Sequence, residues 1–485
     1  MTRAARLLAC LAAALAASCA PPSDRGRGTL MLSECRLPGL DRAALCGSHE
    51  VWEDRAAKQG RRIVLEVAVL AARRRGAEPD PLVVLAGGPG QGAIALAPQV
   101  APLFSRLNDS RDIVLVDQRG TGRSHPLDCK PEKEPTLQSV FEDSLPERMV
   151  LDCLAKLDAD PRHYATPAAV ADLDEVLGAL GYGSVNLWGG SYGTRVALEF
   201  MRRHPARVRT ATLDGVAPAD MKLPLSFVAD GEAAFEKLLA DCEAEPGCRA
   251  AYPDLRRDLG ALRARLARSP APARIGDPVT GEAHAVRVTE GVLLSGLFRP
   301  LYAPEIASLL PLAITRAAGG DFNPLLAQNL EFTNRLGENL SVGMHLSVVC
   351  SEDVPRITPA DLEATARAFF GRVLVDDFLR ACAHWPRATV PADYHEPVRA
   401  TAPVLVLSGG IDPATPPRLG ERVLATLPNG RHAVAPRLAH GVSGQGCAPR
   451  LIEKFVREAD AKSLDVSCLE RLPRPLFILP ARARP

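Results

Sequence analysis

The chain has 485 residues, of which 47% are hydrophobic and 24% are charged. Its 58 basic side chains nearly balance its 57 acidic ones, and the net charge of +1 excludes the basic surface expected of a nucleic-acid-binding protein. The hydrophobic fraction is typical of folded globular proteins, so a largely disordered chain is excluded as well. A chain of this length has room for about two to four domains of roughly 150 residues, or for one enlarged α/β domain.

The N-terminus has the pattern of an export signal. Arg3 and Arg6 precede an apolar run at 7–17, which is too short to span a bilayer, because a transmembrane helix needs about 20 residues. We therefore expect a signal peptide at 1–19 and no integral membrane span. The residues before Cys19 are similar to a bacterial lipoprotein cleavage site, in which Cys19 would carry the lipid, and ordinary signal cleavage is the alternative. The expected location is outside the bacterial cytoplasm: periplasmic, lipid-anchored at the envelope, or secreted.

The cysteine count supports export. Cys10 and Cys19 fall in the leader, so ten of the 12 cysteines remain. An even number in an exported chain favours disulfides, and pairing of neighbours is the simplest connectivity. The neighbouring pairs are Cys35 with Cys46, Cys129 with Cys153, Cys242 with Cys248, Cys350 with Cys382, and Cys447 with Cys468. No Cys-x-x-Cys motif or Cys/His cluster has zinc spacing, so we expect no metal.

Taken in chain order, the predicted elements begin with a strand at 63–70. Short apolar runs at 82–85 and 113–116 each end at a turn, as strands buried on both faces of a parallel sheet do. Helices and strands then alternate, with a helix at 168–180, a strand at 184–187, a helix at 194–203 and a strand at 208–213. This alternation predicts an open α/β sheet.

The pattern changes between about 220 and 395, where helical segments such as 232–242 and 253–267 dominate. Strands return at 404–407 and 431–434, and a helix is expected at 448–459. We therefore expect an α/β fold with a mostly parallel central sheet flanked by helices. Its first part would span 30–219, a mainly helical cap would be inserted at 220–395, and the second part would span 396–485.

The catalytic chemistry starts at Gly-Gly-Ser-Tyr-Gly, residues 189–193. This sequence contains Gly-x-Ser-x-Gly between a predicted strand and a predicted helix, and the glycines allow the sharp turn that exposes a serine at a sheet edge. A plain structural turn is the alternative, and the strand–turn–helix context favours Ser191 as a nucleophile. A serine hydroxyl becomes a good nucleophile only when a base takes its proton.

In enzymes with this turn, an acid and then a histidine follow the serine along the chain. His440 lies in a loop just past a predicted strand and can reach the sheet edge, whereas His432 falls inside that strand. Two acids at strand ends compete to orient His440, namely Asp412 and Asp214. We choose Asp412 because of its place in the chain order, and we expect it to fix the imidazole tautomer and stabilise the imidazolium.

The remaining requirement is an oxyanion hole. The backbone amide of Tyr192, directly after the nucleophile, is one expected donor. The other is expected from Gly88 in Gly-Gly-Pro-Gly, residues 87–90, because backbone without side chains can approach a substrate oxygen closely. A simple turn is the alternative, and a nucleotide-binding loop is excluded because neither Gly-x-Gly-x-x-Gly nor a P-loop is present.

Three motifs in this order resemble those of the proline iminopeptidase and tripeptidyl aminopeptidase family of α/β-hydrolases. They are Gly-Gly-Pro-Gly at 87–90, Asp-Gln-Arg-Gly-Thr-Gly-Arg-Ser at 117–124 and Gly-Gly-Ser-Tyr-Gly-Thr at 189–194. The resemblance continues through Asp-Pro-Ala-Thr-Pro at 412–416 and His440 to the last cysteine pair. It implies an α/β-hydrolase fold with a cap. In the second motif, we expect Asp117 and Arg119 to tie loops together near the sheet edge.

One position departs from the family pattern. Proline iminopeptidases typically have a histidine before Gly-Gly-Pro-Gly, where this chain has Ala86. Together with the leader and the paired cysteines, this departure is more similar to the secreted tripeptidyl aminopeptidases.

The resemblance also implies how the substrate is held. Family members bind the free α-amino group of a peptide with acidic side chains of the cap, and Cys-Ser-Glu-Asp at 350–353 is similar to the family's Cys-x-Glu segment. We expect Glu352 in this role, with Asp353 as a possible substitute and a plain surface acid as the alternative. A carboxylate that faces an ammonium forms a charge-assisted hydrogen bond, which is lost when the amine is blocked.

The sequence therefore predicts an exported serine aminopeptidase that needs no metal or organic cofactor and acts on peptides with a free N-terminus. It would release tripeptides or proline-type N-terminal residues through Ser191, His440 and Asp412. An esterase or another small-molecule hydrolase is the main alternative, because the same triad serves many acyl substrates. A non-catalytic envelope binding protein on a hydrolase scaffold is the second.

Overall fold

The computed structural model of the chain describes residues 28–480 except 130–135, 143–144, 277–280 and 338–339. The expected signal peptide at 1–19, with Cys10 and Cys19, lies outside the described residues. Among the helices that are described, none is long and apolar enough to cross a membrane.

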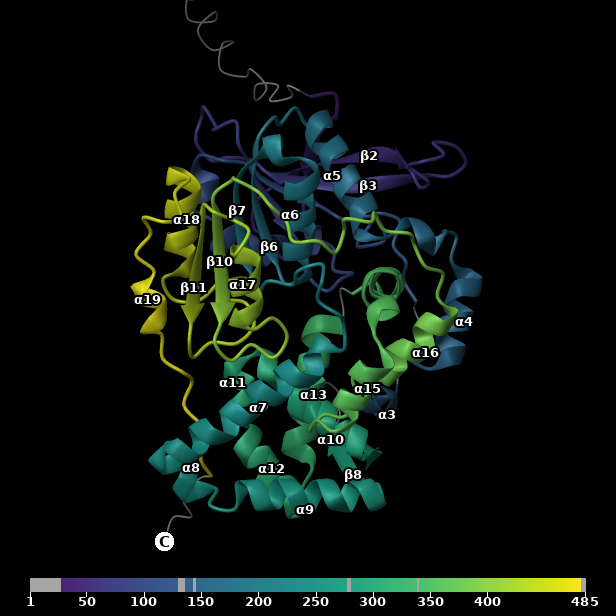
Figure 1. Cartoon of the computed structure of the whole chain (residues 1–485), viewed down its shortest axis with the longest axis vertical. Coiled ribbons are helices and arrows are strands. Elements are labelled where there is room, and N and C mark those ends of the chain that lie inside the picture. Colours follow the sequence, from purple (N-terminus) through teal and green to yellow (C-terminus); the bar gives the residue numbers. More distant parts are fainter. Residues whose placement is uncertain (1–27, 130–135, 143–144, 277–280, 338–339, 481–485) are drawn as a thin grey trace, which may run out of the picture.

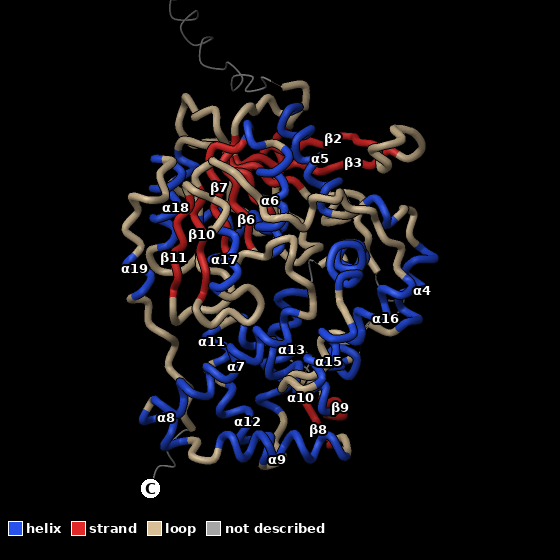
Figure 2. Tube along the Cα trace, viewed as in Figure 1, coloured by secondary structure: helices blue, strands red, loops and turns tan. Residues whose placement is uncertain are grey.

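The described strands of the core form one nine-stranded sheet, in the order β1-β2-β3-β5-β4-β6-β7-β10-β11 (Figures 1 and 2). From β5 to β11 the neighbours are parallel, whereas β1, β2 and β3 extend one edge in antiparallel fashion. The mostly parallel sheet predicted from the sequence is confirmed. The strands are β1 (Ser33–Cys35), β2 (Ala44–Trp52), β3 (Arg62–Leu70), β4 (Leu82–Leu85), β5 (Ile113–Val116), β6 (Val185–Gly190), β7 (Val208–Asp214), β10 (Val404–Gly409) and β11 (Gly430–Ala435).

Helices cover both faces of this sheet. One face carries α5 (Thr166–Ala179), α6 (Tyr192–Arg203) and α17 (Pro417–Leu424), and the other carries α2 (Ala97–Leu103) and α18 (Ala448–Glu458). Successive residues of a strand alternate between the two apolar clusters, so that Val83 packs under α5 and α6 while Val84 packs under α2 and α18. This double burial explains why the strands consist of continuous apolar runs.

Between β7 and β10 the chain forms a mainly helical layer, which we call the cap (Figure 2). Its elements are α7 (Ser226–Ala244), α8 (Pro246–Ala251), α9 (Leu255–Arg268), β8 (Ala271–Gly276), β9 (Ala283–Val288), α10 (Glu290–Phe298), α11 (Pro304–Ala307), α12 (Leu310–Ala318), α13 (Asn323–Gly337), α14 (Val342–Val348), α15 (Pro359–Ala366) and α16 (Asp376–His384). Two helices that precede α5, α3 (Leu137–Glu142) and α4 (Glu147–Lys156), contact cap elements: α3 touches α10, α13 and β9, and α4 touches α16. The cap has its own apolar core, separate from the clusters that sandwich the sheet.

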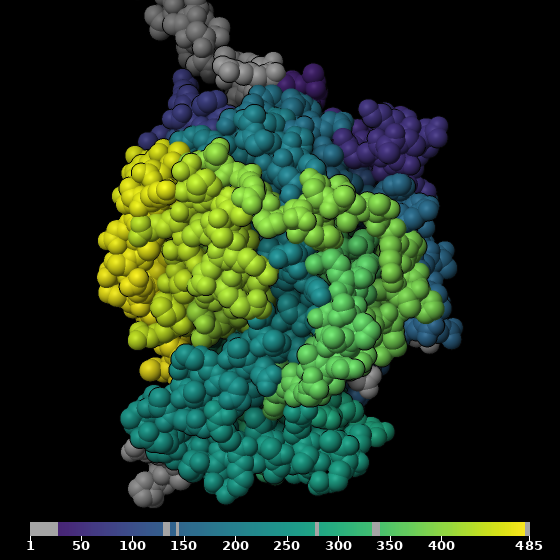
Figure 3. All heavy atoms as spheres, in the orientation of Figure 1, coloured from purple at the N-terminus to yellow at the C-terminus, as the bar shows by residue number. Residues whose placement is uncertain are grey.

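The C-terminal segment crosses from the core to the cap. After α19 (Ser467–Glu470) the chain runs down over the cap at 471–480, a segment that we call the strap (yellow in Figures 1 and 3). Arg474 pairs with Asp241 of α7 and lies over the ring of Phe477, 4.5 Å from its centre. Phe477 packs into the apolar core of the cap, and the Tyr252 hydroxyl donates to the Ile478 carbonyl at 2.5 Å. The strap therefore fastens the cap to the core at a point far from the insertion in sequence.

All five neighbouring cysteine pairs form disulfides, as the sequence predicts. Cys35–Cys46 joins β1 to β2, and Cys242–Cys248 joins α7 to α8. Cys447–Cys468 links the start of α18 to α19, at the core end of the strap. Each bond closes a short stretch of chain, which restricts the unfolded state locally.

Several elements differ from the sequence prediction. The strand β2 was missed because polar residues interrupt its apolar pattern, and only its ends are buried. The β8–β9 hairpin lies in the stretch where the sequence indicates mostly helices. Helix α6 begins at Tyr192, two residues before the expected 194, because the turn is confined to the serine itself. Strand β6 continues to Gly190, beyond the expected 187.

Candidate active site

Ser191 lies at the carboxyl end of β6, in the turn that leads into α6. Its backbone has φ of 54° and ψ of −123°, a conformation that costs a non-glycine residue about 1–3 kcal/mol. The flanking glycines are needed at this turn, since a Cβ on Gly189 would lie 2.4 Å from the Gly193 carbonyl oxygen and a Cβ on Gly193 would lie 2.1 Å from that of Leu85. This is the geometry of a nucleophile elbow, which presents a serine hydroxyl above the sheet edge.

The end of β7 connects this turn to the loop at 436–447 that carries His440, which we call the histidine loop. The carbonyl of Asp214 accepts the Ser191 amide at 2.8 Å, and its carboxylate accepts the amides of Val442 and Ser443 at 2.9 and 2.7 Å. Gly215 then lies against the imidazole, since a Cβ there would be 3.2 Å from His440 Cε1. Asp214, the alternative acid in the sequence, therefore holds the backbone of the histidine loop.

The imidazole pairs instead with Asp412, which lies in the turn after β10 and is buried. His440 Nδ1 lies 2.8 Å from Asp412 Oδ2. The amides of Ala414 and Thr415 donate to Asp412 Oδ1 at 2.8 and 2.9 Å, and the Thr415 hydroxyl donates to Oδ2 at 2.8 Å while lying 3.1 Å from His440 Nδ1. Thr415 was not predicted to contribute; the Asp-Pro sequence, typical of an Asx turn, is the signal that could have found it.

Burial and pairing shift the pKa values of His440 and Asp412 in opposite directions. Burial would lower the pKa of His440, but the charge of Asp412 and the hydrogen bond to it raise that pKa above its ordinary value of 6.5. Burial would raise the pKa of Asp412, but His440 and the backbone donors hold it below 3.8. The pair is thus arranged to stabilise the imidazolium that forms when a serine proton is taken.

This pairing predicts the pH dependence of catalysis. The imidazole must be neutral to accept a proton, so kcat/KM is expected to fall as the pH decreases through a midpoint above 6.5, the ordinary value. Removing the negative charge in Asp412→Asn should move the midpoint below that of the wild type, because only the charge of Asp214 then opposes the effect of burial on the pKa of His440. A pH–rate profile of both proteins measures this shift, and an unchanged midpoint would contradict the pairing.

Two backbone amides flank Ser191. Tyr192 is the first residue of α6, so its N–H has no acceptor within the helix. On the other side lies Gly87, where a Cβ would be 3.4 Å from Ser191 Cβ, and Gly88 follows it with an exposed backbone. Within the described residues, the amides of Gly88 and Tyr192 donate to no group of the chain. Both amides are therefore available to a carbonyl oxygen placed beside Ser191.

The cap contacts the site from above. The ring of Tyr302, in the turn Arg299–Tyr302, meets the His440 imidazole edge to face with centres 5.1 Å apart, and its carbonyl accepts the His440 amide at 3.3 Å. On the other side of Ser191, a Cβ on Gly88 would lie 3.1 Å from Leu340 Cδ1. Sequence reasoning did not find Tyr302 or Leu340, because both are remote from the motifs.

Glu352, the expected ligand of the substrate amine, is completely buried in the cap. Its carboxylate accepts the amide and the hydroxyl of Thr166 at 2.7 and 3.0 Å, the hydroxyl of Tyr394 at 2.5 Å, and Nη1 of Arg195 at 3.2 Å. Burial raises the pKa of Glu352, and the charge of Arg195 opposes this rise. A carboxylate has about four acceptor positions, so a substrate ammonium would have to displace one of these donors. The amine-binding role of Glu352 stays a prediction.

This buried cluster also reaches the nucleophile elbow. Asp353 pairs with Arg195 of α6, with Nη1 at 2.9 Å and Nη2 at 3.2 Å. The Tyr192 hydroxyl lies 2.7 Å from Thr166 Oγ1 and accepts from Gln118 Nε2 at 3.1 Å. The residue after the nucleophile is therefore held by two side chains of the core, one of which, Thr166, is bound in turn by Glu352 of the cap.

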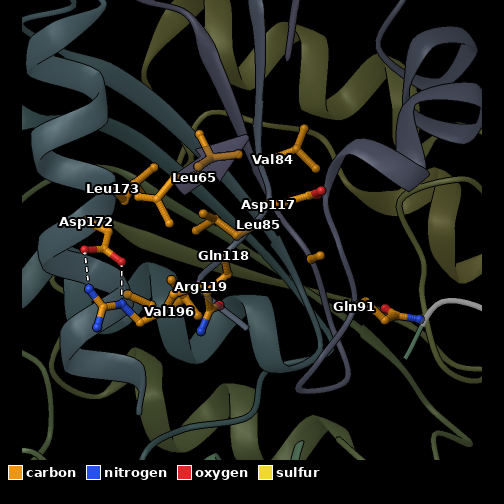
Figure 4. A pocket seen from close by; sticks show the side chains of 13 residues that line it. Leu65, Val84, Leu85, Gln91, Asp117, Gln118, Arg119, Asp172, Leu173 and Val196 are labelled. Carbon is orange, nitrogen blue, oxygen red and sulfur yellow. Dashed lines mark hydrogen bonds and ion pairs between the residues drawn. The ribbon is translucent and has the colours of Figure 1, made fainter. Parts of the chain in front are cut away.

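The second motif holds loops together, as the sequence predicts. The Asp117 carboxylate accepts the amides of Ile94 and Arg123, and Arg119 pairs with Asp172 of α5 at 2.5 and 2.8 Å (Figure 4). Asp117, Arg119 and Asp172 line a small cavity of about 30 Å³, with Gln91 at the right of the view. A volume of this size holds a water molecule or two and not a substrate.

Comparison with known proteins agrees with this architecture. The family model of the alpha/beta hydrolase fold matches residues 80–283, which include Ser191, and that of the TAP-like protein matches 367–468, which include Asp412 and His440. The serine protease Hip1 of Mycobacterium tuberculosis is 26% identical over 430 residues, which cover 80% of this chain and 79% of that protein.

Two further relatives match over shorter stretches. The tripeptidyl aminopeptidase of Streptomyces lividans is 26% identical over 214 residues, 41% of this chain and 40% of that protein. The proline iminopeptidase of Neisseria gonorrhoeae is 32% identical over 140 residues, 28% of this chain and 34% of that protein. Among solved structures, the proline iminopeptidase of Mycobacterium smegmatis is 18% identical and aligns with 85% of this chain and 98% of its own, with a TM-score of 0.37. The chain therefore has the α/β-hydrolase fold with a TAP-like C-terminal part, and it is similar to proteins named serine protease, proline iminopeptidase and tripeptidyl aminopeptidase.

Proposed function

We propose that the protein is an exported serine aminopeptidase, which removes residues from the free N-terminus of peptides. The observation that carries the proposal is the meeting, at one sheet edge, of Ser191 in a strained turn and the Asp412–His440 pair. Beside them lie the two amides of Gly88 and Tyr192, which have no acceptor within the described chain. The set supplies a nucleophile, a base with its orienting acid, and donors for an oxyanion.

The reaction follows from these positions. Ser191 Oγ adds to the scissile carbonyl carbon while His440 takes the hydroxyl proton, and the negative charge on the carbonyl oxygen is bound by the amides of Gly88 and Tyr192. The C–N bond then breaks, and the imidazolium gives its proton to the departing amine. Water, deprotonated by His440, attacks the acyl-enzyme; the ester C–O bond then breaks, the imidazolium returns its proton to Ser191 Oγ, and the N-terminal fragment is released. Asp412 keeps the imidazole in the required tautomer throughout.

The cap favours a chain end over an internal segment of a substrate. Tyr302 touches His440, and Leu340 lies against Gly88, so cap residues stand over both sides of the nucleophile. A folded protein would have to thread a loop between these contacts, whereas a peptide end can enter from one side. The names of the relatives, a tripeptidyl aminopeptidase, a proline iminopeptidase and a serine protease, agree with a peptide substrate.

The export part of the proposal is supported by the disulfides. Five bonds among ten cysteines are typical of a chain that folds in an oxidising compartment. The leader pattern at 1–19 agrees with this compartment. Lipid attachment at Cys19 and ordinary cleavage remain the two proposed fates of the leader, and the mass of the mature N-terminal peptide distinguishes them.

An esterase is the second candidate, because the triad and the oxyanion donors suit any acyl group. A pool of peptides, each present free and N-acetylated, decides between the two functions when its digestion is followed by mass spectrometry. The aminopeptidase proposal expects loss of N-terminal residues, one or three at a time, from the free peptides only. Equal cleavage of acetylated peptides, or turnover of simple esters without any peptide cleavage, would favour the esterase.

Glu352→Gln tests which role the buried carboxylate has. Because the chain already supplies its donors, we expect the substitution to destabilise the fold by about 3 kcal/mol and to reduce turnover of peptides and esters alike. Thermal unfolding and steady-state kinetics on both substrate classes measure these effects. A higher KM for free peptides alone, with stability and ester turnover unchanged, would instead support the amine-binding role.

A further inference from the structure

The loop that carries Gly88 has little of its own to hold it in place. We call residues 87–91 the oxyanion loop. Gly88 and Gly90 have φ of 105° and 110°, a region that favours glycine, and three glycines in four residues give the free loop many alternative conformations. The one backbone hydrogen bond within it, from the Gln91 amide to the Gly87 carbonyl, is 3.4 Å long. The direction of the Gly88 amide therefore depends on contacts from outside the loop.

Those contacts come from one short segment of the cap, Leu340 to His345, at the start of α14. The Ser341 amide donates to the Gly90 carbonyl at 2.9 Å, and Leu340 pairs with Gln91 in an antiparallel bridge. His345 Nδ1 lies 2.9 Å from the Pro89 carbonyl oxygen, which belongs to the residue directly after Gly88. Because that oxygen can only accept, the imidazole must carry its proton on Nδ1.

We propose that His345 is a positioning residue of the oxyanion hole: its Nδ1–H fixes the Pro89 carbonyl and thereby keeps the Gly88 amide aimed at the substrate oxygen. The inference rests on the proposed function, since it assigns a purpose to the Gly88 amide. His345 acts through the loop and touches neither the substrate nor the nucleophile.

The surroundings of His345 suit a fixed, neutral donor. Its ring packs against Phe378 of α16, with centres 5.5 Å apart, which restricts its rotation. Burial lowers the pKa of His345, and the hydrogen bond to Pro89 and the charge of Asp353 only oppose that shift. The imidazole therefore stays uncharged at neutral pH, with one ring nitrogen protonated and directed at the loop.

The chain offers a matched control. His395 Nδ1 also lies 2.9 Å from a backbone carbonyl, that of Ala219, and burial lowers the pKa of His395 as well. The His395 bond is of the same kind and length but lies outside the oxyanion loop. His345→Leu and His395→Leu thus remove equivalent hydrogen bonds, and only the first should affect the oxyanion hole.

The test compares kinetics with binding of a transition-state analogue. In His345→Leu we expect kcat on a peptide that the wild type cleaves to fall about 10- to 100-fold, with KM changed by less than about threefold. Affinity for a peptide aldehyde, whose tetrahedral adduct carries an oxyanion, should fall by the same factor, and affinity for the released peptide product should not change. His345→Asn keeps an N–H donor near the position of Nδ1 and should therefore have most of the wild-type kcat. The control variant His395→Leu should have the wild-type kcat.

Several results would overturn the inference. A wild-type kcat in His345→Leu would do so, as would equal losses in His345→Leu and His395→Leu, or a rise in KM alone. If His345→Leu does not fold, His345→Gln is tested in its place. The amide nitrogen of glutamine lies one bond beyond the position of Nδ1, so this variant should show the same loss of kcat. Wild-type protein that turns over no acyl substrate would refute the proposed function as well, whereas an active wild type with an unaffected His345→Leu refutes the positioning role alone.

Discussion

Ser191→Ala is expected to lower kcat about 10⁶-fold on peptide substrates and to leave the fold intact. Without Oγ no acyl-enzyme can form, and the amides of Gly88 and Tyr192 alone support only a slow attack by water. Alanine also has a Cβ, so the substitution does not change the backbone strain at φ of 54°, and the turn should keep its conformation. Steady-state kinetics and thermal unfolding of both proteins measure the two parts of this prediction.

Ser226→Ala is a suitable control for this substitution. The Ser226 hydroxyl is buried without a hydrogen-bond partner among the described residues, so its removal costs neither a bond nor a catalytic group. A fluorophosphonate probe should label the wild type and Ser226→Ala but not Ser191→Ala. Substantial turnover by a folded Ser191→Ala protein would exclude Ser191 as the nucleophile.

Asp412→Asn is expected to lower kcat about 10⁴-fold with little change in KM. An asparagine can present its amide N–H₂ to Nδ1 of His440, which then has to accept, so the proton moves to the nitrogen that should receive it from Ser191. Kinetics with the same peptide, measured at the pH optimum of each protein, separate this loss from the accompanying shift of the pH profile.

Asp214→Asn provides the comparison, because the sequence leaves both acids open. Asp214 holds the amides of Val442 and Ser443 and does not pair with the imidazole. Its asparagine variant should therefore lose stability, through weaker bonds to the histidine loop, and retain far more kcat than Asp412→Asn. The reverse order of the two kcat values would make Asp214 the orienting acid.

The features that could be predicted from the sequence are those that depend on local chain geometry. The strands β4, β5 and β10 are continuous apolar runs because both faces of the sheet are covered, and each ends in a motif with its own turn signal. Gly88 and Asp412 lie in the turns after β4 and β10, and Ser191 lies in the turn after β6, so local chain geometry indicates all three. The disulfides were also accessible, because each joins cysteines that are close in sequence.

The features that escaped prediction depend on contacts between distant parts of the chain. Chain order alone favours Asp412 over Asp214 in the sequence, and it does not show the partners that separate the two acids, an imidazole in one case and two backbone amides in the other. His345 is an ordinary helical residue until α14 is placed against the oxyanion loop, 256 positions away along the chain. The four donors to Glu352 could not be predicted, because the motif shows the type of the residue and not its surroundings.

The strap has a mechanical consequence for access to Ser191. The polypeptide enters the cap after β7 and leaves it before β10. If these two crossings were the sole connections, the cap could rotate against the core about the line that joins them. The strap adds an attachment from α19 to α7 and α8, beside the contacts that α3 and α4 make with the cap, and each such attachment restricts rotation of the cap against the core. In the described chain the cap is thus held against the core. Substrates therefore have to reach Ser191 through gaps that side chains and short loops can open.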